Sequence, residues 1–201
     1  MTRQMGLNLC HSEASVTHIP FSHCQIGDFT VVALSDGDMA GSLDLLSGIT
    51  PSQASELQQA ARITAPGNIP VSSYLVYKVG LTILIDAGTG GLNNSGGQLK
   101  QHLAACGVAP ADVDMVLLTH GHPDHIGGLV TCEGARMFPR ASLFIHQLEI
   151  AYWLDDNELT HASERRQRNF TLVRHVLDVW GNRAFLSDEK NKLVLCEMTL
   201  E

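Results

Sequence analysis

The chain has 201 residues, of which 44% are hydrophobic and 17% charged, and its formal net charge is −8. This length is typical of one domain, or at most two, with a sizeable hydrophobic core. The acidic balance argues against a general nucleic-acid-binding surface and against binding to an anionic membrane. Because the sequence has no run of about 18 apolar residues, we expect no membrane-spanning helix.

The cysteines and the N-terminal residues indicate the compartment. Five cysteines are scattered without a Cys-x-x-Cys pair, so we expect reduced thiols and a cytoplasmic protein. Residues 1–20 lack an apolar core behind basic residues, and no signal peptide is predicted. Residues 1–26 are assigned to an N-terminal arm and residues 27–201 to one domain. The spacings of the histidines and cysteines in this arm match no zinc module: Cys10, His11, His18, His23 and Cys24.

The first half of the chain predicts strands and one helix. Residues 29–34 are apolar and β-branched, which favours a strand, and residues 35–38 are expected to end it in a turn. Thr50, followed by Pro51 and Gln53, predicts a helix start with a capping box. Residues 71–77 and 81–85 are typical of a β-hairpin.

The second half alternates between helices and strands. We expect a flexible glycine-rich loop at 89–97, helices at 98–106, 147–154 and 163–180, and short strands at 115–118 and 141–145. An alternation of strand, helix and strand predicts an α/β layered fold. Tyr152, Trp153 and Trp180 are interpreted as core aromatics, with a hydrophobic substrate pocket as the alternative. His146 is expected to end the strand at 141–145 without binding metal, and His161 and His175 are expected to be exposed or helix-end residues.

One stretch carries the chemistry. Residues 119–128 read Thr-His-Gly-His-Pro-Asp-His-Ile-Gly-Gly and follow the apolar run 115–118. His120 and His122 are two residues apart in extended chain, so their side chains point the same way. Pro123 bends the chain and turns the next two side chains to another side, where they suit a second ion. The four predicted metal ligands are His120, His122, Asp124 and His125.

Imidazole and carboxylate groups suit zinc, iron, manganese or cobalt. Two such ions about 3.5–4 Å apart can share a water, lower its pKa and polarise the bond that the water attacks. The alternative is a polar loop whose histidines coincide by chance. The density of ligating side chains directly after a buried strand favours the metal site.

This stretch resembles the signature of the metallo-β-lactamase superfamily, Thr-His-x-His-x-Asp-His-x-Gly-Gly. Residues 27–37, the Asp-Ala-Gly turn at Asp86 and residues 138–141 are similar to the branch containing methyl parathion hydrolase and related lactonases. The resemblance covers about residues 27–180. It implies an αββα sandwich, of which the N-terminal half and the following helices would be present here.

The resemblance also implies a function. The expected enzyme is a metal-dependent hydrolase that uses a metal-activated water on a small ester, lactone or phosphotriester, with no nucleic-acid partner. A complete site would hold two zinc ions, with iron or manganese as alternatives. Asp124 would also carry a proton to the leaving group. Asp86, unless it is an ordinary turn residue, would hydrogen-bond behind the ligands, and Thr119 would support them.

The sequence departs from the family downstream of the motif. The family's third histidine, bridging aspartate and last histidine come from later segments, and no Gly-His-x-x-Gly-His stretch follows His125. The chain is therefore expected to be a truncated form. Half of an αββα sandwich leaves one face of the sheet uncovered. This predicts that the chain associates with other copies of itself, for example as a homodimer. The alternative functions are a non-catalytic metal-binding remnant and a mononuclear iron redox enzyme similar to persulfide dioxygenases.

Overall fold

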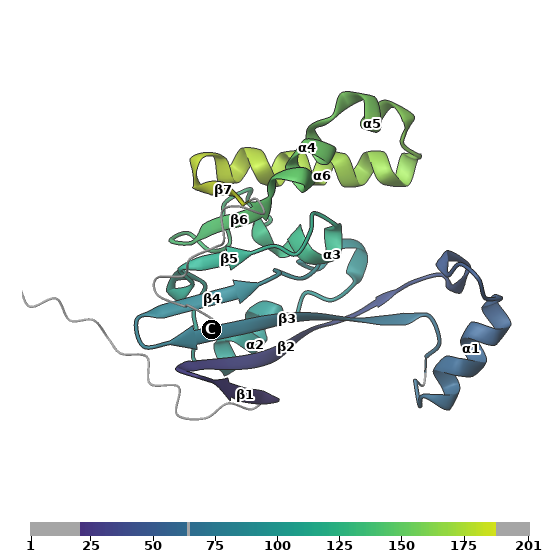
Figure 1. Ribbon diagram of the computed structural model, residues 1–201, viewed down its shortest axis with the longest axis horizontal. Coiled ribbons are helices and arrows are strands. Elements are labelled where there is room, and N and C mark those ends of the chain that lie inside the picture. Colours follow the sequence, from purple (N-terminus) through teal and green to yellow (C-terminus); the bar gives the residue numbers. More distant parts are fainter. Residues whose placement is uncertain (1–20, 64, 188–201) are drawn as a thin grey trace, which may run out of the picture.

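The computed structural model describes residues 21–63 and 65–187, and a seven-stranded sheet organises them (Figure 1). The strands lie side by side in chain order. Neighbours from β1 to β4 are antiparallel, whereas neighbours from β4 to β7 are parallel. The strands are β1 (His23–Ile26), β2 (Phe29–Ala40), β3 (Asn68–Lys78), β4 (Leu81–Ile85), β5 (Met115–Leu117), β6 (Ser142–His146) and β7 (Ala184–Ser187). The predicted α/β class is confirmed.

Helices connect these strands, and the parallel strands need them because a parallel connection must cross the sheet. The α-helices are α1 (Pro51–Ala60), α2 (Leu99–Ala105), α3 (Pro123–Ile126), α4 (Gln147–Leu154), α5 (Asp156–His161) and α6 (Glu164–Trp180). Short 3-10 helices are η1 (Leu43–Leu45), η2 (Leu92–Asn94), η3 (Pro110–Asp112), η4 (Gly127–Leu129) and η5 (Gly181–Arg183). Within residues 21–63 and 65–187, none of the helices has the length and apolar character needed to cross a bilayer.

One face of the sheet carries the hydrophobic core. A row of paired positions crosses five neighbouring strands, and every side chain in it is buried: Val32, Leu75, Leu84, Val116 and Leu143. Side chains of α2 and α6 join the same cluster. Burial of this row, at roughly 1.5–3 kcal/mol per aliphatic side chain, favours the sheet over the unfolded chain.

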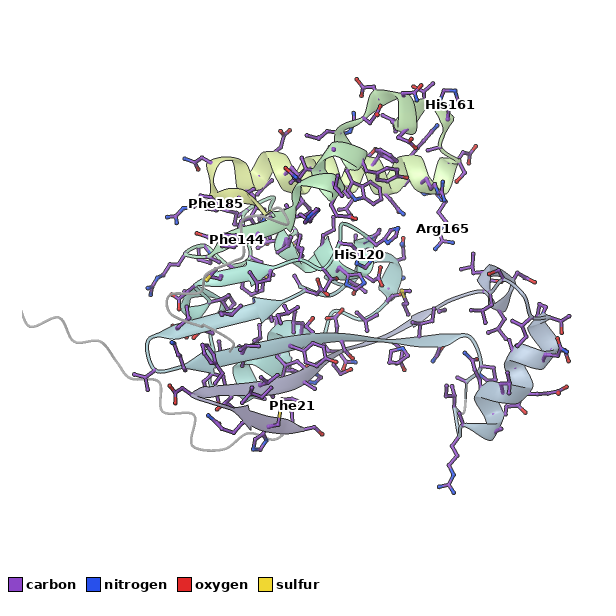
Figure 2. All side chains as sticks on the ribbon, viewed as in Figure 1. Phe21, His120, Phe144, His161, Arg165 and Phe185 are labelled. Carbon is purple, nitrogen blue, oxygen red and sulfur yellow. The ribbon has the colours of Figure 1, made fainter. Side chains whose placement is uncertain are left out.

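The opposite face is more open. Its row includes Tyr74 and Phe185, each 45% exposed, and Phe144. The rings of Phe144 and Phe185 stack with their centroids 5.4 Å apart on the last two strands (Figure 2). Successive side chains of a strand point to opposite faces, so the same strands supply a buried face and an open one.

Most predicted elements are confirmed. Thr50 caps α1 with the expected capping box, the hairpin of β3 and β4 turns at Val79 and Gly80, and α4 spans the predicted residues 147–154. α6 buries its apolar stripe against the core. The additional helix α5 was not predicted; it begins where Asp155 caps the backbone N–H groups of the next residues.

The strand predicted at residues 29–34 ends later than predicted, at Ala40 of β2. β2 continues through Ser35–Asp38 to Ala40, because a register shift between Ser35 and Gly37 absorbs the polar residues into the ladder. β2 and β3 thereby form a long ribbon that carries α1 away from the sheet (Figure 1). The apolar stripe of α1 is largely unpacked: Ala54 is buried, but Leu57 is 63% exposed.

Two further segments differ from the predictions. β1 lies inside the stretch assigned to the N-terminal arm, and residues 1–20 of that arm lie outside the described residues. The loop at 89–97, expected to be flexible, contains η2 and is held by the buried carboxylate of Asp36, which accepts hydrogen bonds from Thr89 and Gly97.

Candidate metal centre

The motif lies where β5 ends and α3 begins. β5 ends at Leu117, and His122 is the extended N-cap of α3, with φ −73° and ψ 154°. Pro123 takes the first helical position, where its missing N–H costs nothing. His120 and His122 therefore leave the strand end in extended chain, whereas Asp124 and His125 lie in the first turn of α3.

Close backbone packing fixes this turn against the neighbouring loop. The N–H of Ala87 donates to the carbonyl of His125 at 2.8 Å. A Cβ at Gly127 would overlap the carbonyl of Thr89, and one at Gly128 would overlap that of Ala87. Only glycine fits at these two positions, and the close approach places α3 directly over the end of β4.

Three imidazoles gather at this end of the sheet. The ring of His120 lies with its centroid 4.7 Å from that of His122 and 4.0 Å from that of His125. Figure 2 shows His120 beside α3, between the sheet and the helices α4–α6. The predicted ligands therefore lie in one cluster. The sequence spacing had suggested that His120 and His122 point to one side and that Asp124 and His125 point to another.

Asp86 lies behind this cluster and orients it. Its backbone is left-handed, with φ 59°, a conformation that aspartate tolerates better than most residues. Its carboxylate accepts hydrogen bonds from the backbone N–H of Thr119 at 2.9 Å and from the Thr119 hydroxyl at 2.8 Å. Its Oδ2 is 2.9 Å from Nδ1 of His125, so this ring turns Nε2 toward Asp124.

The charges in the cluster are coupled. Burial, then the neighbouring imidazoles, lower the pKa of His120 and favour its neutral, metal-binding form. Burial alone would also lower the pKa of His125, but hydrogen bonds to Asp124 and Asp86 outweigh it and raise the pKa to about 9. The hydrogen bond from His125 lowers the pKa of Asp124, which keeps its carboxylate ionised.

The donor atoms fit a divalent ion in part. His125 Nε2 and Asp124 Oδ2 are 3.2 Å apart, close to the spacing of about 3.4 Å between two donors on one tetrahedral zinc with ligand distances near 2.1 Å. Among the described residues, no three donor side chains converge on one point. The cluster thus supplies two pairs of donors, and each ion would need further ligands from outside it.

A cavity of about 230 Å³ opens beside the two histidines. Tyr152 and Trp153 line it. Trp153 also belongs to the buried core, as the favoured interpretation predicted, and so does Trp180, which donates to the carbonyl of Leu129. The remaining lining residues are Glu149, Arg166 and Asn169. None of these three was predicted, because helical spacing alone does not tell which turn of α4 or α6 faces the motif.

Three further histidines lie at or on the helices α4, α5 and α6. His146 caps α4 by accepting the N–H of Leu148 at 3.2 Å, and His161 contacts the carbonyl of Asn157 at 2.8 Å. His161 lies on α5, well away from His120 (Figure 2). His175 is exposed on α6. These positions agree with the predicted helix-end and surface roles.

Comparison with known proteins assigns the family. The model of the metallo-beta-lactamase superfamily matches residues 66–186, more than half of the chain. The chain belongs to the metallo-beta-lactamase superfamily. The predicted family and the predicted α/β fold class are confirmed.

Individual members of the superfamily are similar over parts of the chain. Metallo-beta-lactamase domain-containing protein 1 of Mus musculus is 49% identical over 49 residues, which are 24% of this chain and 16% of that protein. The crystal structure of the hydrolase AbOPH superposes with a TM-score of 0.69 at 28% identity, covering 80% of this chain and 56% of the other. AidC, described as a dizinc quorum-quenching lactonase, shares the fold with a TM-score of 0.74 at 24% identity, over 86% and 62%. The chain thus spans less than two thirds of each of these relatives.

Proposed function

We propose that this chain is a metal-dependent hydrolase that acts on a small ester, lactone or phosphotriester. The observation that supports this most is the bridge of His125 between Asp86 and Asp124, beside the ring pair of His120 and His122. Two of the similar proteins are a hydrolase and a dizinc lactonase, which supports the same class of reaction.

The proposed metal ligands form two pairs. His120 and His122 would hold one ion, and Asp124 with His125 a second; zinc suits this donor set best, with iron and manganese as alternatives. When bound, the metal would act as a Lewis acid on the scissile bond and make water acidic near neutral pH. Asp86 accepts the Nδ1–H of His125 and so directs Nε2 toward Asp124, the partner with which it would hold the ion.

Asp124 also serves in proton transfer. Its carboxylate is half-buried, and the hydrogen bond from His125 lowers its pKa and keeps it ionised at neutral pH. Its second oxygen, which does not pair with His125, can therefore accept a proton from the attacking water and pass it to the leaving oxygen. The cavity lined by Tyr152 and Trp153 offers an apolar wall for the substrate's organic group, consistent with a small and fairly apolar substrate.

A second candidate is a non-catalytic metal-binding protein. It is favoured because no three donors converge among the residues that the structure describes. A mononuclear iron redox enzyme remains distinguishable by the identity of its metal, since two pairs of donors do not select between zinc and iron.

Metal content and hydrolysis, measured together, test the proposal. Elemental analysis of the purified chain should find zinc, and the double variant His120→Ala/His122→Ala should hold less of it because one donor pair is removed. Turnover of lactones or phosphotriesters by the unmodified chain should exceed the turnover by that variant. Zinc binding without such turnover would favour the non-catalytic protein. Tightly bound iron in place of zinc would favour the redox enzyme.

A further inference from the structure

We propose that Glu149 is a positioning residue for the metal-binding pair His120 and His122, acting through the backbone that joins them. This inference rests on the proposed metal-dependent function. Glu149 belongs to α4, not to the signature stretch, and neither the family match nor the sequence assigns it a role.

A single carboxylate oxygen makes the connection. Oε2 of Glu149 accepts the backbone N–H of Gly121 at 2.9 Å and the indole N–H of Trp153 at 3.0 Å. Gly121 lies between the two histidines, outside any strand or helix, so this bond satisfies a donor that no strand or helix partner satisfies. Because the acceptor is ionised, both bonds are stronger than neutral ones.

The turn and the indole lie in direct contact. A Cβ on Gly121 would overlap Nε1 of Trp153, so this position accepts only glycine without movement of the indole. The ring of His122 meets the Trp153 ring nearly edge-on, with centroids 5.7 Å apart. The orientation of the histidine pair therefore depends on where the indole is held.

Trp153 is itself anchored. It is 3% exposed, and its ring packs against the buried ring of Phe170 on α6 at a centroid distance of 4.9 Å. Glu149 and Trp153 are four residues apart on α4, so they face the same direction. The packing of α4 on α6 therefore holds Trp153 and Glu149 in place. These two residues in turn hold Gly121 and the neighbouring rings of His120 and His122.

The position of the charge matters as well. Glu149 lines the same cavity as His120 and His122, so its carboxylate lies near the proposed donor pair. Groups that orient metal ligands from behind typically change metal affinity by about 10–100-fold when they are removed. A purely structural glutamate would change stability and leave zinc affinity unaltered.

Zinc competition with a chromophoric chelator tests the inference on the full chain. Glu149→Ala should weaken zinc binding by roughly tenfold or more. Glu149→Gln should lose less, since its amide oxygen can still accept both N–H groups but without the charge. Glu158→Ala is the matched control: it removes the same charge from an exposed position on α5 and should bind zinc as the unmodified chain does.

A second measurement does not depend on activity. The chain has two tryptophans, so its NMR spectrum contains two indole N–H resonances. Zinc should shift the Trp153 resonance and leave that of Trp180 in place, and Glu149→Ala should move the same Trp153 signal before any zinc is added. If Glu149→Ala does not fold, Trp153→Phe replaces it, because it removes the indole donor and keeps an aromatic ring.

The outcomes separate two failures. If the unmodified chain binds zinc and the Glu149 and Trp153 variants bind it equally well, the positioning role is wrong while the proposed function stands. If the unmodified chain binds no zinc, the proposed function falls, and this inference falls with it.

Discussion

At the scale of single residues, the carboxylate of Asp86 determines how the predicted ligands are presented. It accepts hydrogen bonds from Thr119 and from Nδ1 of His125, and it is 6% exposed. A group that is buried and bonded in this way fixes the tautomer of its histidine partner. An ordinary turn aspartate, the alternative at the sequence level, would not make these contacts.

Asp86→Asn should therefore weaken zinc binding by about 10–100-fold, because the amide donates where Thr119 and His125 also donate. Asp28→Asn, at an exposed turn between β1 and β2, is the control with the same chemical change. Isothermal titration calorimetry with zinc measures the zinc affinity of each variant. Equal affinities for the two variants would mean that Asp86 serves the turn alone.

The pH dependence of stability follows from His125. Without metal, its pKa is raised from the ordinary 6.5 to about 9. The stabilisation from charged His125 is therefore complete below about pH 6.5 and is lost as the pH rises through about 9. Zinc requires the neutral ring, so zinc affinity should rise over the same range.

Melting temperatures of the chelator-treated chain, recorded between pH 6.5 and 9, check this prediction. We expect a decline with pH that is smaller in His125→Ala. With saturating zinc the decline should vanish or reverse. A melting temperature that rises steadily with pH in the metal-free chain would contradict the assigned charge state.

At the scale of elements, Asp36 links β2 to the segments that follow β4. Its side chain is fully buried and accepts four hydrogen bonds, two from Thr89 and one each from the backbone of Gly97 and Leu99. It thereby holds the glycine-rich loop and the first turn of α2. The glycine-rich loop lies against the turn at Gly127, so the conformation of the loop affects the position of the candidate metal ligands.

Asp36→Ala should destabilise the fold by about 3 kcal/mol or more, because it leaves several buried donors without an acceptor. Asp38→Ala, two residues along the same strand but exposed, should change the unfolding free energy by less than about 0.5 kcal/mol. Urea unfolding followed by circular dichroism compares the two. A similar midpoint for both variants would show that water replaces the carboxylate.

At the scale of the whole molecule, metal binding and folding are linked. The proposed ligands come from the end of β5 and the first turn of α3, and Asp86 comes from the end of β4. These segments are brought together only in the folded chain. An ion that binds the folded chain alone adds about 2.7 kcal/mol at a hundredfold excess over its dissociation constant.

Zinc should accordingly raise the melting temperature of the chain, and a chelator should reverse the change. The double variant His120→Ala/His122→Ala should show a reduced rise, since one donor pair is removed. Differential scanning calorimetry at fixed protein concentration measures the shift. An unchanged melting temperature in zinc-saturated protein would contradict specific binding to the folded state.

The sequence by itself determined most local elements and the candidates for metal binding. Thr50 with Gln53 specified the start of α1, and the alternation of β3 and β4 specified the hairpin, because capping and side-chain period act over a few residues. The motif His-x-His-x-Asp-His named its four metal-competent residues and, through Pro123, the bend between them.

Only the tertiary structure decided which distant residues meet this motif. The continuation of β2 past Ser35, the anchoring of the loop by Asp36 and the contact of Glu149 with Gly121 all join segments far apart in the chain. Such contacts depend on how helices pack on the sheet, and short-range periodicity carries no record of that packing. For the same reason, the cavity wall formed by Arg166 and Asn169 emerges only when α6 lies across the end of the sheet.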